Sequence, residues 1–206
     1  GGVIISNATL HNFDEIRKKN IQIGDVVEIQ RAGDVIPQVL RVTKKNTENS
    51  KNIEPPKKCP VCGAATYKEK NEVVLRCRNT YGCYAQKISQ IIHFISKKAL
   101  NIDGFGEKQA KQFYDLNIIS NIVDIFSLEK NKNIIENLEG WGDLSYMNLV
   151  SSIEKSKTIN LDKFIYSLGI RFIGEINAEI LAKELKNINN FISLSDNTST
   201  LANIDG

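Results

Sequence analysis

The chain has 206 residues, of which 41% are hydrophobic and 25% charged, an ordinary composition for a soluble protein with one large domain or two to three small ones. No apolar run approaches the roughly 18 residues that a membrane-spanning helix needs. Residues 1–8 also lack the basic stretch and hydrophobic core of a secretion signal. The sequence therefore argues against a membrane protein, and we expect a cytoplasmic one.

The charges are unevenly distributed along the chain. Residues 1–99 contain 17 Lys and Arg against 9 Asp and Glu, a net charge of +8, whereas residues 100–206 contain 10 against 15, a net charge of −5. A basic surface suits a polyanion, because Lys and Arg that neutralise phosphates release counterions. If the acidic second half also binds nucleic acid, it must do so in another way.

The first 52 residues are predicted to form short strands. Residues 26–31 alternate apolar and polar side chains, and residues 35–42 predict a second strand that Pro37 interrupts. Gly24-Asp25 and Gly33-Asp34 supply turns at the two ends of the first strand. This pattern is compatible with part of a small β-barrel, but the segment is too short for a closed one.

Helices are predicted on either side of a polar linker. Asn12, followed three residues later by Glu15, is typical of a helix start. Residues 44–58 are polar and end in Pro55-Pro56, which favours a linker. Beyond residue 86 the sequence predicts helices, and in residues 86–98 four isoleucines fall on one helical face.

All the cysteines of the chain lie within residues 59–83, with the spacing C-x2-C-x14-C-x5-C. A tetrahedral ion needs turns that present its ligands in pairs, and Pro60-Val61 with Gly63 has the turn chemistry for the first pair. The alternatives are two disulfides or free buried thiols. A cytoplasmic chain favours Zn²⁺, and four protein ligands leave no open position, so the metal is expected to be structural. The predicted ligands are Cys59, Cys62, Cys77 and Cys83. His93 is a further conceivable ligand, but on an isoleucine-rich face it is more often a packed residue.

The second half repeats a short glycine pattern. Residues 102–106 (IDGFG), 138–142 (LEGWG) and 203–206 share it, and residues 168–174 (LGIRFIG) are a looser variant. Such a turn between two helices gathers backbone N–H groups at the start of the second helix, where they bind phosphate without a cationic side chain. One such turn is usually a plain helix cap, but several in register favour DNA binding and explain how an acidic domain binds a polyanion. The predicted DNA-binding glycines are Gly104, Gly106, Gly140, Gly142, Gly169 and Gly174.

These segments resemble a known family. Residues 8–12 (ATLHN), 23–25 (IGD) and 31–39 (RAGDVIPQV) are similar to the OB domain of bacterial NAD-dependent DNA ligases. The cysteine spacing, His93-Phe94, residues 102–108 (IDGFGEK) and 168–171 (LGIR) follow that family in the same order. The resemblance covers essentially the whole chain, and residues 31–39 are its most specific part.

The resemblance implies sealing of nicked duplex DNA through a lysine-AMP and a DNA-adenylate, with NAD as the AMP donor and Mg²⁺ as a further cofactor, in replication and repair. It also implies that the OB barrel contacts the minor groove at the nick, with Arg31 on phosphate and Val35 and Ile36 against the groove. Without the family, Val35 and Ile36 would be assigned to the barrel core, since alternating apolar residues are core by default.

Departures from the family limit what this chain does alone. The family's lysine nucleophile sits in a Lys-x-Asp-Gly motif, but here Asp103-Gly104 and Asp205-Gly206 are preceded by Asn101 and Asn203. The adenylation domain, the NAD-binding domain, the BRCT domain and the first barrel strand are expected to be missing. We therefore expect no catalytic residue here and no activity in the isolated chain.

The predicted fold is multidomain α+β in three parts. Residues 1–52 form a partial OB-fold barrel, residues 53–87 a small four-cysteine zinc finger, and residues 88–206 an all-α helix-hairpin-helix domain truncated in its fourth motif. We expect a monomer that binds nicked double-stranded DNA. Two alternatives are a non-enzymatic binder of branched or damaged DNA, which would have no reason for the cysteines, and a zinc-ribbon component of a transcription or translation complex, which would not explain the repeated hairpins.

Overall fold

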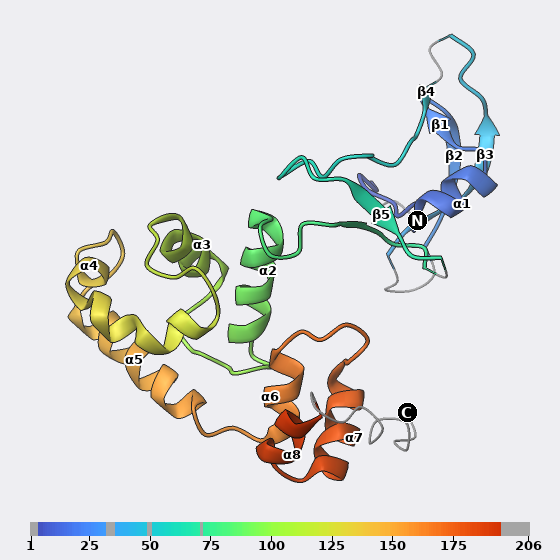
Figure 1. Ribbon diagram of the computed structural model, residues 1–206. Coiled ribbons are helices and arrows are strands. Elements are labelled where there is room, and N and C mark those ends of the chain that lie inside the picture. The colour runs from blue at the N-terminus through green and yellow to red at the C-terminus, as the bar shows by residue number, and fades with distance from the viewer. Residues whose placement is uncertain (1–3, 32–35, 49–50, 71, 195–206) are drawn as a thin grey trace. The chain divides into compact units, whose positions relative to one another are not determined.

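The computed structural model describes residues 4–31, 36–48, 51–70 and 72–194 (Figure 1). The chain divides into two compact units, Gly1–Cys83 and Tyr84–Gly206. The first holds the short strands and the cysteines, and the second is helical, so the mixed α+β class predicted from the sequence is confirmed. The finer division into three domains, with boundaries between residues 52 and 53 and between residues 87 and 88, stays a prediction.

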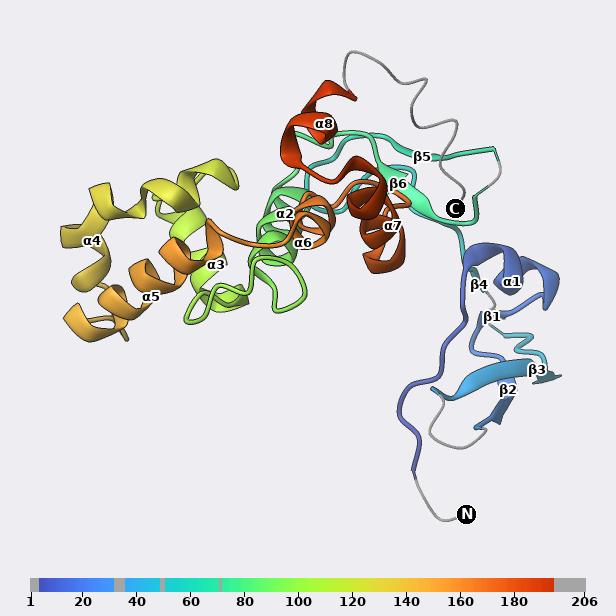
Figure 2. The ribbon, with the colours of Figure 1, turned by 90° about the horizontal axis from the view of Figure 1, so that it is seen from below.

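The first unit begins with a short helix and four strands: α1 (Phe13–Lys18), β1 (Gln22–Ile23), β2 (Val26–Gln30), β3 (Gln38–Lys44) and β4 (Lys51–Asn52). Asn12 caps α1, and its side chain accepts a hydrogen bond of 2.9 Å from Glu15 N, as the sequence predicted. Figure 2 shows β2 and β3 side by side, an antiparallel pair, while β1 pairs with β4.

Strand β3 starts later than the sequence predicted. We expected a strand from residue 35, but β3 begins at Gln38, immediately after Pro37. Proline has no N–H to donate to a strand ladder, so a regular strand starts more readily after it than across it. The carbonyl of Pro37 instead accepts a 2.7 Å hydrogen bond from Thr9 N, which draws the start of the chain alongside β3.

The core of this part of the unit is small. Ile16, Ile21 and Val39 are its buried residues in the described part of the chain, and partly buried side chains pack around them.

The side chain of Asp25 stabilises the predicted turn between β1 and β2. Its side chain is fully covered and accepts hydrogen bonds of 2.9 Å from Gln22 N, 2.9 Å from Asn46 N and 3.0 Å from Lys45 Nζ.

The cysteine region contains one more antiparallel pair, β5 (Thr66–Lys68) with β6 (Leu75–Cys77). Cys77 is the last residue of β6 and pairs with Thr66. An isolated bridge between Lys58 and Ala65 brings Cys59 beside this pair of strands. The two short strands therefore carry one ligand and position the loops that hold the other three.

The second unit is a series of helices connected by turns. Its elements are α2 (Tyr84–Ile95), α3 (Glu107–Asp115), η1 (Val123–Asn131), α4 (Lys132–Glu136), α5 (Asp143–Ser156), α6 (Leu161–Ser167), α7 (Glu175–Leu185) and α8 (Ile188–Ser193). The predicted isoleucine face of α2 is confirmed, because Ile88, Ile91 and Ile95 are buried and Ile92 packs against the core that contains Ile91 and Ile95. No helix in the described residues is long and apolar enough to cross a membrane.

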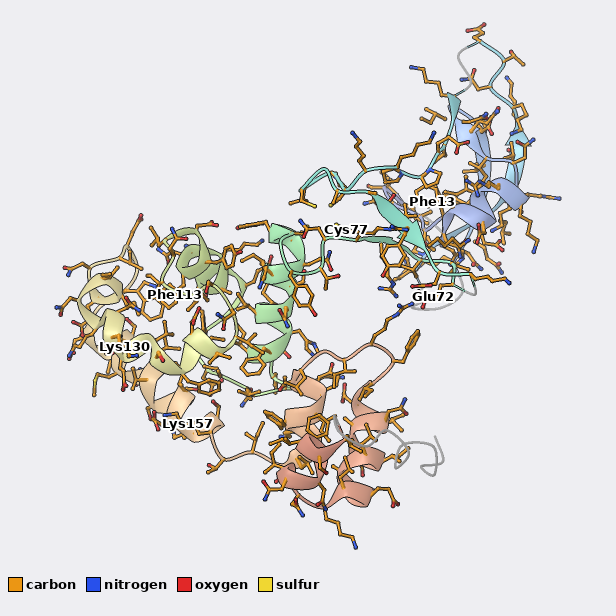
Figure 3. The ribbon with its side chains drawn as sticks, viewed as in Figure 1. Phe13, Glu72, Cys77, Phe113, Lys130 and Lys157 are labelled. Carbon is orange, nitrogen blue, oxygen red and sulfur yellow. The ribbon has the colours of Figure 1, made fainter. Side chains whose placement is uncertain are left out.

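Two cores hold these helices. The larger joins α2 through α5 around Phe113, which is fully buried and lies among the helices of this region in Figure 3. The smaller joins α6, α7 and α8 around Ile165, Ala178 and Leu185. Each core places the end of one helix next to the start of another, which is the arrangement that a helix-hairpin-helix motif requires.

Candidate zinc and nucleic-acid sites

The four cysteine thiols converge on one point. All four Sγ atoms lie within 4.8 Å of one another, with Cys59 Sγ 3.9 Å from Cys83 Sγ and Cys62 Sγ 3.5 Å from Cys77 Sγ. Sulfur ligands about 2.3 Å from a tetrahedral Zn²⁺ lie about 3.8 Å from one another, so the donor set fits this ion. A disulfide would bring two sulfurs to about 2.05 Å. The zinc prediction is confirmed, and the alternative of two disulfides does not describe the site.

Two turns of different kinds present the thiols. In the first, Gly63 adopts φ +71° and its N–H donates a 2.9 Å hydrogen bond to the carbonyl of Cys59. This is the predicted turn, and the left-handed backbone explains its glycine. In the second, Asn79 accepts hydrogen bonds of 3.0 Å from Cys83 N and from Gly82 N. The sequence analysis missed Asn79, although an Asn three residues before a Gly is a recognisable turn signal.

The thiols differ in acidity before any metal binds. The backbone N–H groups of Cys62 and Val61 lower the pKa of Cys59 to about 7, because they stabilise its thiolate. Burial raises the pKa of Cys77 to about 11. Zn²⁺ binds thiolates, so the ion would hold all four groups deprotonated and neutralise half of their combined charge. With four protein ligands and no open position, its role is structural.

Three hairpins in the described part of the second unit, residues 84–194, share one backbone plan. In each, an N–H donates to a carbonyl three residues earlier, from Phe105 to Ile102 at 3.3 Å, from Trp141 to Leu138 at 3.0 Å and from Ile173 to Ile170 at 3.0 Å. A glycine with extended backbone then caps the following helix: Gly106 caps α3, Gly142 caps α5 and Gly174 caps α7. The repeat seen in the sequence therefore corresponds to a repeated structure.

The third hairpin, which the sequence showed as a looser variant of the pattern, places its glycines differently from the first two. Gly104 and Gly140 adopt φ +78° and +82° two residues before the capping glycine, and the residue at that position in the third hairpin is Phe172, with φ +68°. Gly169, with φ +63°, lies farther back and ends α6. It is not the structural equivalent of Gly104, and its proposed contact with DNA stays a prediction.

A small buried residue follows the capping glycine in two of these hairpins. Ala110 and Ala178 each donate their N–H to the carbonyl of the capping glycine four residues earlier, and each is fully buried. Ser145 lies one residue earlier in its helix, and its Oγ accepts a 2.9 Å hydrogen bond from Gly142 N.

Each capped helix begins with an acidic residue that is paired with a lysine. Glu107 lies 2.6 Å from Lys111, Asp143 lies 3.6 Å from Lys132, and Glu175 lies 2.5 Å from Lys98. An acidic side chain in the first turn interacts favourably with the positive end of the helix dipole, but it would repel a phosphate at the same place. The lysine partners offset that repulsion, a feature that the sequence analysis did not detect.

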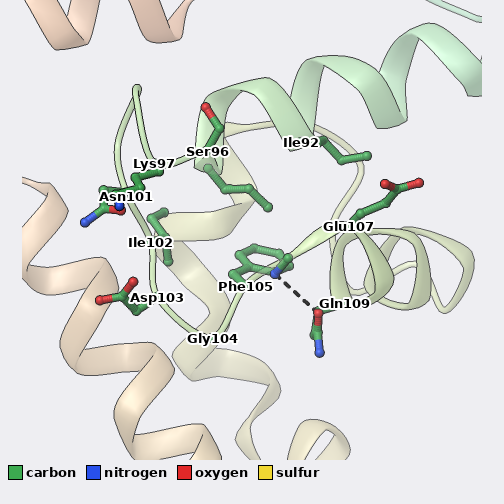
Figure 4. A pocket seen from close by; sticks show the side chains of 12 residues that line it. Ile92, Ser96, Lys97, Asn101, Ile102, Asp103, Gly104, Phe105, Glu107 and Gln109 are labelled. Carbon is green, nitrogen blue, oxygen red and sulfur yellow. Dashed lines mark hydrogen bonds between the residues drawn. The ribbon is translucent and has the colours of Figure 1, made fainter. Parts of the chain in front are cut away.

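A hollow of about 430 Å³ lies beside the first hairpin, between the end of α2 and the start of α3 (Figure 4). Gly104 and Gly106 form part of its wall, and Lys97 and Asn101 line it from the α2 side. The N–H of Gly106 donates a 3.3 Å hydrogen bond to the side chain of Gln109, drawn as the dashed line. This amide therefore has only a long, replaceable partner within the chain.

Arg31, Val35 and Ile36 are the residues predicted to contact the minor groove, and the two that the structure describes lie at the surface. Arg31 follows β2 and is exposed, and Ile36 is 71% exposed. Val35 lies outside the described residues. The alternative that Ile36 belongs to the barrel core is wrong, since Val39 is the buried residue of this segment.

Comparison with known families matches three parts of the chain. Residues 1–51 match the NAD-dependent DNA ligase OB-fold domain, residues 58–85 the NAD-dependent DNA ligase C4 zinc finger domain, and residues 163–206 the helix-hairpin-helix motif. The chain belongs to the NAD-dependent DNA ligase family, as a segment that carries these parts.

Three similar proteins match the chain over all or nearly all of its length. It is 51% identical to the DNA ligase of Pelagibacter ubique (strain HTCC1062) and 45% identical to that of Wolbachia pipientis wMel, each over 100% of this chain and 32% of the relative. It is 46% identical to the DNA ligase of Rickettsia bellii (strain OSU 85-389), over 94% of this chain and 29% of the relative. The chain thus spans about a third of the length of these relatives.

Proposed function

We propose that the chain is the DNA-binding portion of an NAD-dependent DNA ligase that joins a 3′-hydroxyl to a 5′-phosphate at a nick in duplex DNA. The family matches support the ligase assignment and the dependence on NAD. The observation that carries the DNA-binding role is the common geometry of the three hairpins, each of which ends in a glycine at the start of a helix.

The capping glycines leave room for a phosphate. A Cβ built at Gly142 or at Gly174 would meet no atom within 4 Å, and neither residue has a positive φ. The fold itself therefore does not demand glycine at these two positions. Ligand access to the backbone N–H groups is what requires glycine here, because a side chain would stand between the helix start and a phosphate oxygen.

The other parts have supporting roles in this proposal. Arg31, Val35 and Ile36 contact the nick from the OB part, where exposure of Arg31 and Ile36 is consistent with a surface role. Zn²⁺ on the four cysteines stabilises the module between the OB part and the helices. The enzyme works as a monomer in the cytoplasm, and its NAD and Mg²⁺ sites lie outside this chain.

The test is binding of a labelled nicked duplex to the 206-residue chain and to its Gly142→Ala and Gly174→Ala variants. We expect both variants to melt within a few degrees of the unmodified chain and to bind about tenfold more weakly, as the loss of one good phosphate contact costs on the order of 1–2 kcal/mol. Lys108→Ala is the matched control, since Lys108 lies in the first turn of α3 and we expect a smaller effect from its side chain.

Salt dependence separates amide contacts from charge contacts. Loss of an amide contact should weaken binding without changing the slope of affinity against salt, because no cationic side chain is removed. Variants that fold and bind with full affinity would contradict the phosphate-binding role of the hairpins. A chain that binds neither nicked nor intact duplex would contradict the proposed function as a whole.

A further inference from the structure

The third hairpin differs from the other two in the residue at its tip, the position two residues before the capping glycine. Where the first two hairpins have Gly104 and Gly140, the third has Phe172, whose side chain is 74% exposed. Ile176, in the first turn of α7, is also 74% exposed, and Ile170 is 40% exposed. Three apolar side chains within seven residues therefore face solvent around the glycine that caps α7.

Two features of Phe172, its backbone conformation and its exposed ring, are energetically unfavourable in the isolated chain. Its φ of +68° is a left-handed conformation that glycine adopts freely and that residues with a Cβ rarely adopt. Its ring also remains largely in water, where an apolar side chain gains none of the free energy of burial. The first two hairpins show that a glycine fits the same turn. The structure therefore indicates that the aromatic side chain meets a partner outside the chain.

The surroundings of Phe172 define the partner's chemistry. The guanidinium of Arg171 lies 4.7 Å from the centre of the Phe172 ring, so a cation and an apolar surface are presented together. The carbonyl of Phe172 accepts a 2.9 Å hydrogen bond from the side chain of Asn177, which fixes the tip against the start of α7. A hollow of about 380 Å³ lined by Gly174, Glu175, Ile176 and Asn177 lies at the same helix start.

We infer that Phe172 and Ile176 form an apolar contact with the minor groove of duplex DNA, with Arg171 beside them in the groove. The walls of the minor groove are deoxyribose faces, and proteins that enter it combine arginine with apolar side chains such as Phe and Ile. This inference rests on the proposed function, since it assumes that the hairpins face DNA. It adds that the third hairpin binds through apolar contact as well as through backbone N–H groups.

The first experiment compares Phe172→Gly and Ile176→Ala with the unmodified chain in nicked-duplex affinity and melting temperature. We expect Phe172→Gly to melt at the same or a higher temperature, because glycine relieves the left-handed strain, and to bind roughly tenfold more weakly. Ile176→Ala should also weaken binding. Val123→Ala is the control, because Val123 is 69% exposed in the same unit and lies on η1, away from the hairpin.

Two further readouts identify the contact. The slope of affinity against salt should stay the same in Phe172→Gly and become shallower in Arg171→Ala, since only the arginine displaces a counterion. Replacing guanine by inosine removes an amino group from the minor groove and leaves the major-groove atoms unchanged. The ratio of unmodified to Phe172→Gly affinity should therefore rise on the inosine duplex.

The outcomes distinguish this inference from the proposed function. If the unmodified chain binds no nicked duplex, the proposed function itself fails. If it binds and Phe172→Gly binds equally well, only the apolar contact is refuted. A Phe172→Gly variant that melts well below the unmodified chain would show that Phe172 packs within the protein, and an unchanged affinity ratio on the inosine duplex would place any contact outside the minor groove. Either result overturns the inference.

Discussion

The Nε2 atom of His93 on α2 lies 2.7 Å from the carbonyl oxygen of Tyr166 on α6, and the two rings meet edge-on with their centres 4.7 Å apart. These residues are 73 positions apart in the chain. The contact joins the helix before the first hairpin to the helix before the third. His93, which the sequence left open as a zinc ligand, is therefore a packed residue in the helical unit.

Gly169→Ala should destabilise the helical unit by about 1–2 kcal/mol, the cost of a left-handed conformation for a residue with a Cβ. Gly169 has φ +63°, and a Cβ there would lie 3.3 Å from Cδ2 of His93. Urea unfolding followed by circular dichroism measures the change, with Gly174→Ala as the control because its site is open. Equal stability of the two variants would contradict the predicted backbone strain at Gly169.

The chain should bind one equivalent of Zn²⁺, and Cys77→Ser should lose it. The serine leaves three thiolates, which bind zinc far more weakly, so the cysteine module unfolds while the separate helical unit keeps its circular dichroism. Elemental analysis of protein purified without chelator measures the metal. Less than about half an equivalent in the unmodified chain would count against the site.

Asp25→Asn should destabilise the OB part at neutral pH but not at low pH. Hydrogen bonds from Asn46 N, from Lys45 and from Gln22 N hold the pKa of Asp25 below its ordinary value. A carboxyl with a lowered folded-state pKa contributes stability that is present above its unfolded pKa and is lost as pH falls through the folded one. The urea midpoints of the two proteins should therefore differ between about pH 5 and 8, and the difference should begin to shrink as the pH falls below about 4. A difference that persists unchanged at about pH 3 would assign the effect to packing rather than to charge.

The isolated chain should not react with NAD. No Lys-x-Asp-Gly motif is present, because the two Asp-Gly pairs follow Asn101-Ile102 and Asn203-Ile204. Incubation with NAD and Mg²⁺ followed by intact mass measurement should show no added AMP. A stoichiometric adduct on a lysine would mean that this segment carries the nucleophile and would overturn the division of roles proposed above.

The sequence was sufficient to predict features that depend on residues close together in the chain. The four cysteines, the turn at Gly63 and the cap at Asn12 were all predicted, because ligand spacing, turn residues and helix caps depend on neighbours within a few positions. The isoleucine face of α2 was predicted for the same reason, since a period of about 3.6 residues is visible in a short window. These features determine the zinc site and the helical class of the second unit.

Only the tertiary structure decided the register of the third hairpin and the exposure of its side chains. The glycine pattern grouped Gly169 with Gly104 as predicted DNA contacts, but the structural equivalent of Gly104 is Phe172, because the chain closes the turn with a hydrogen bond from Ile173 N to the carbonyl of Ile170. The sequence also could not show that Ile36 faces solvent while Val39 is buried, or that His93 packs on Tyr166. Burial and long-range contact depend on which elements meet in space, and a pattern of neighbouring residues does not contain that information.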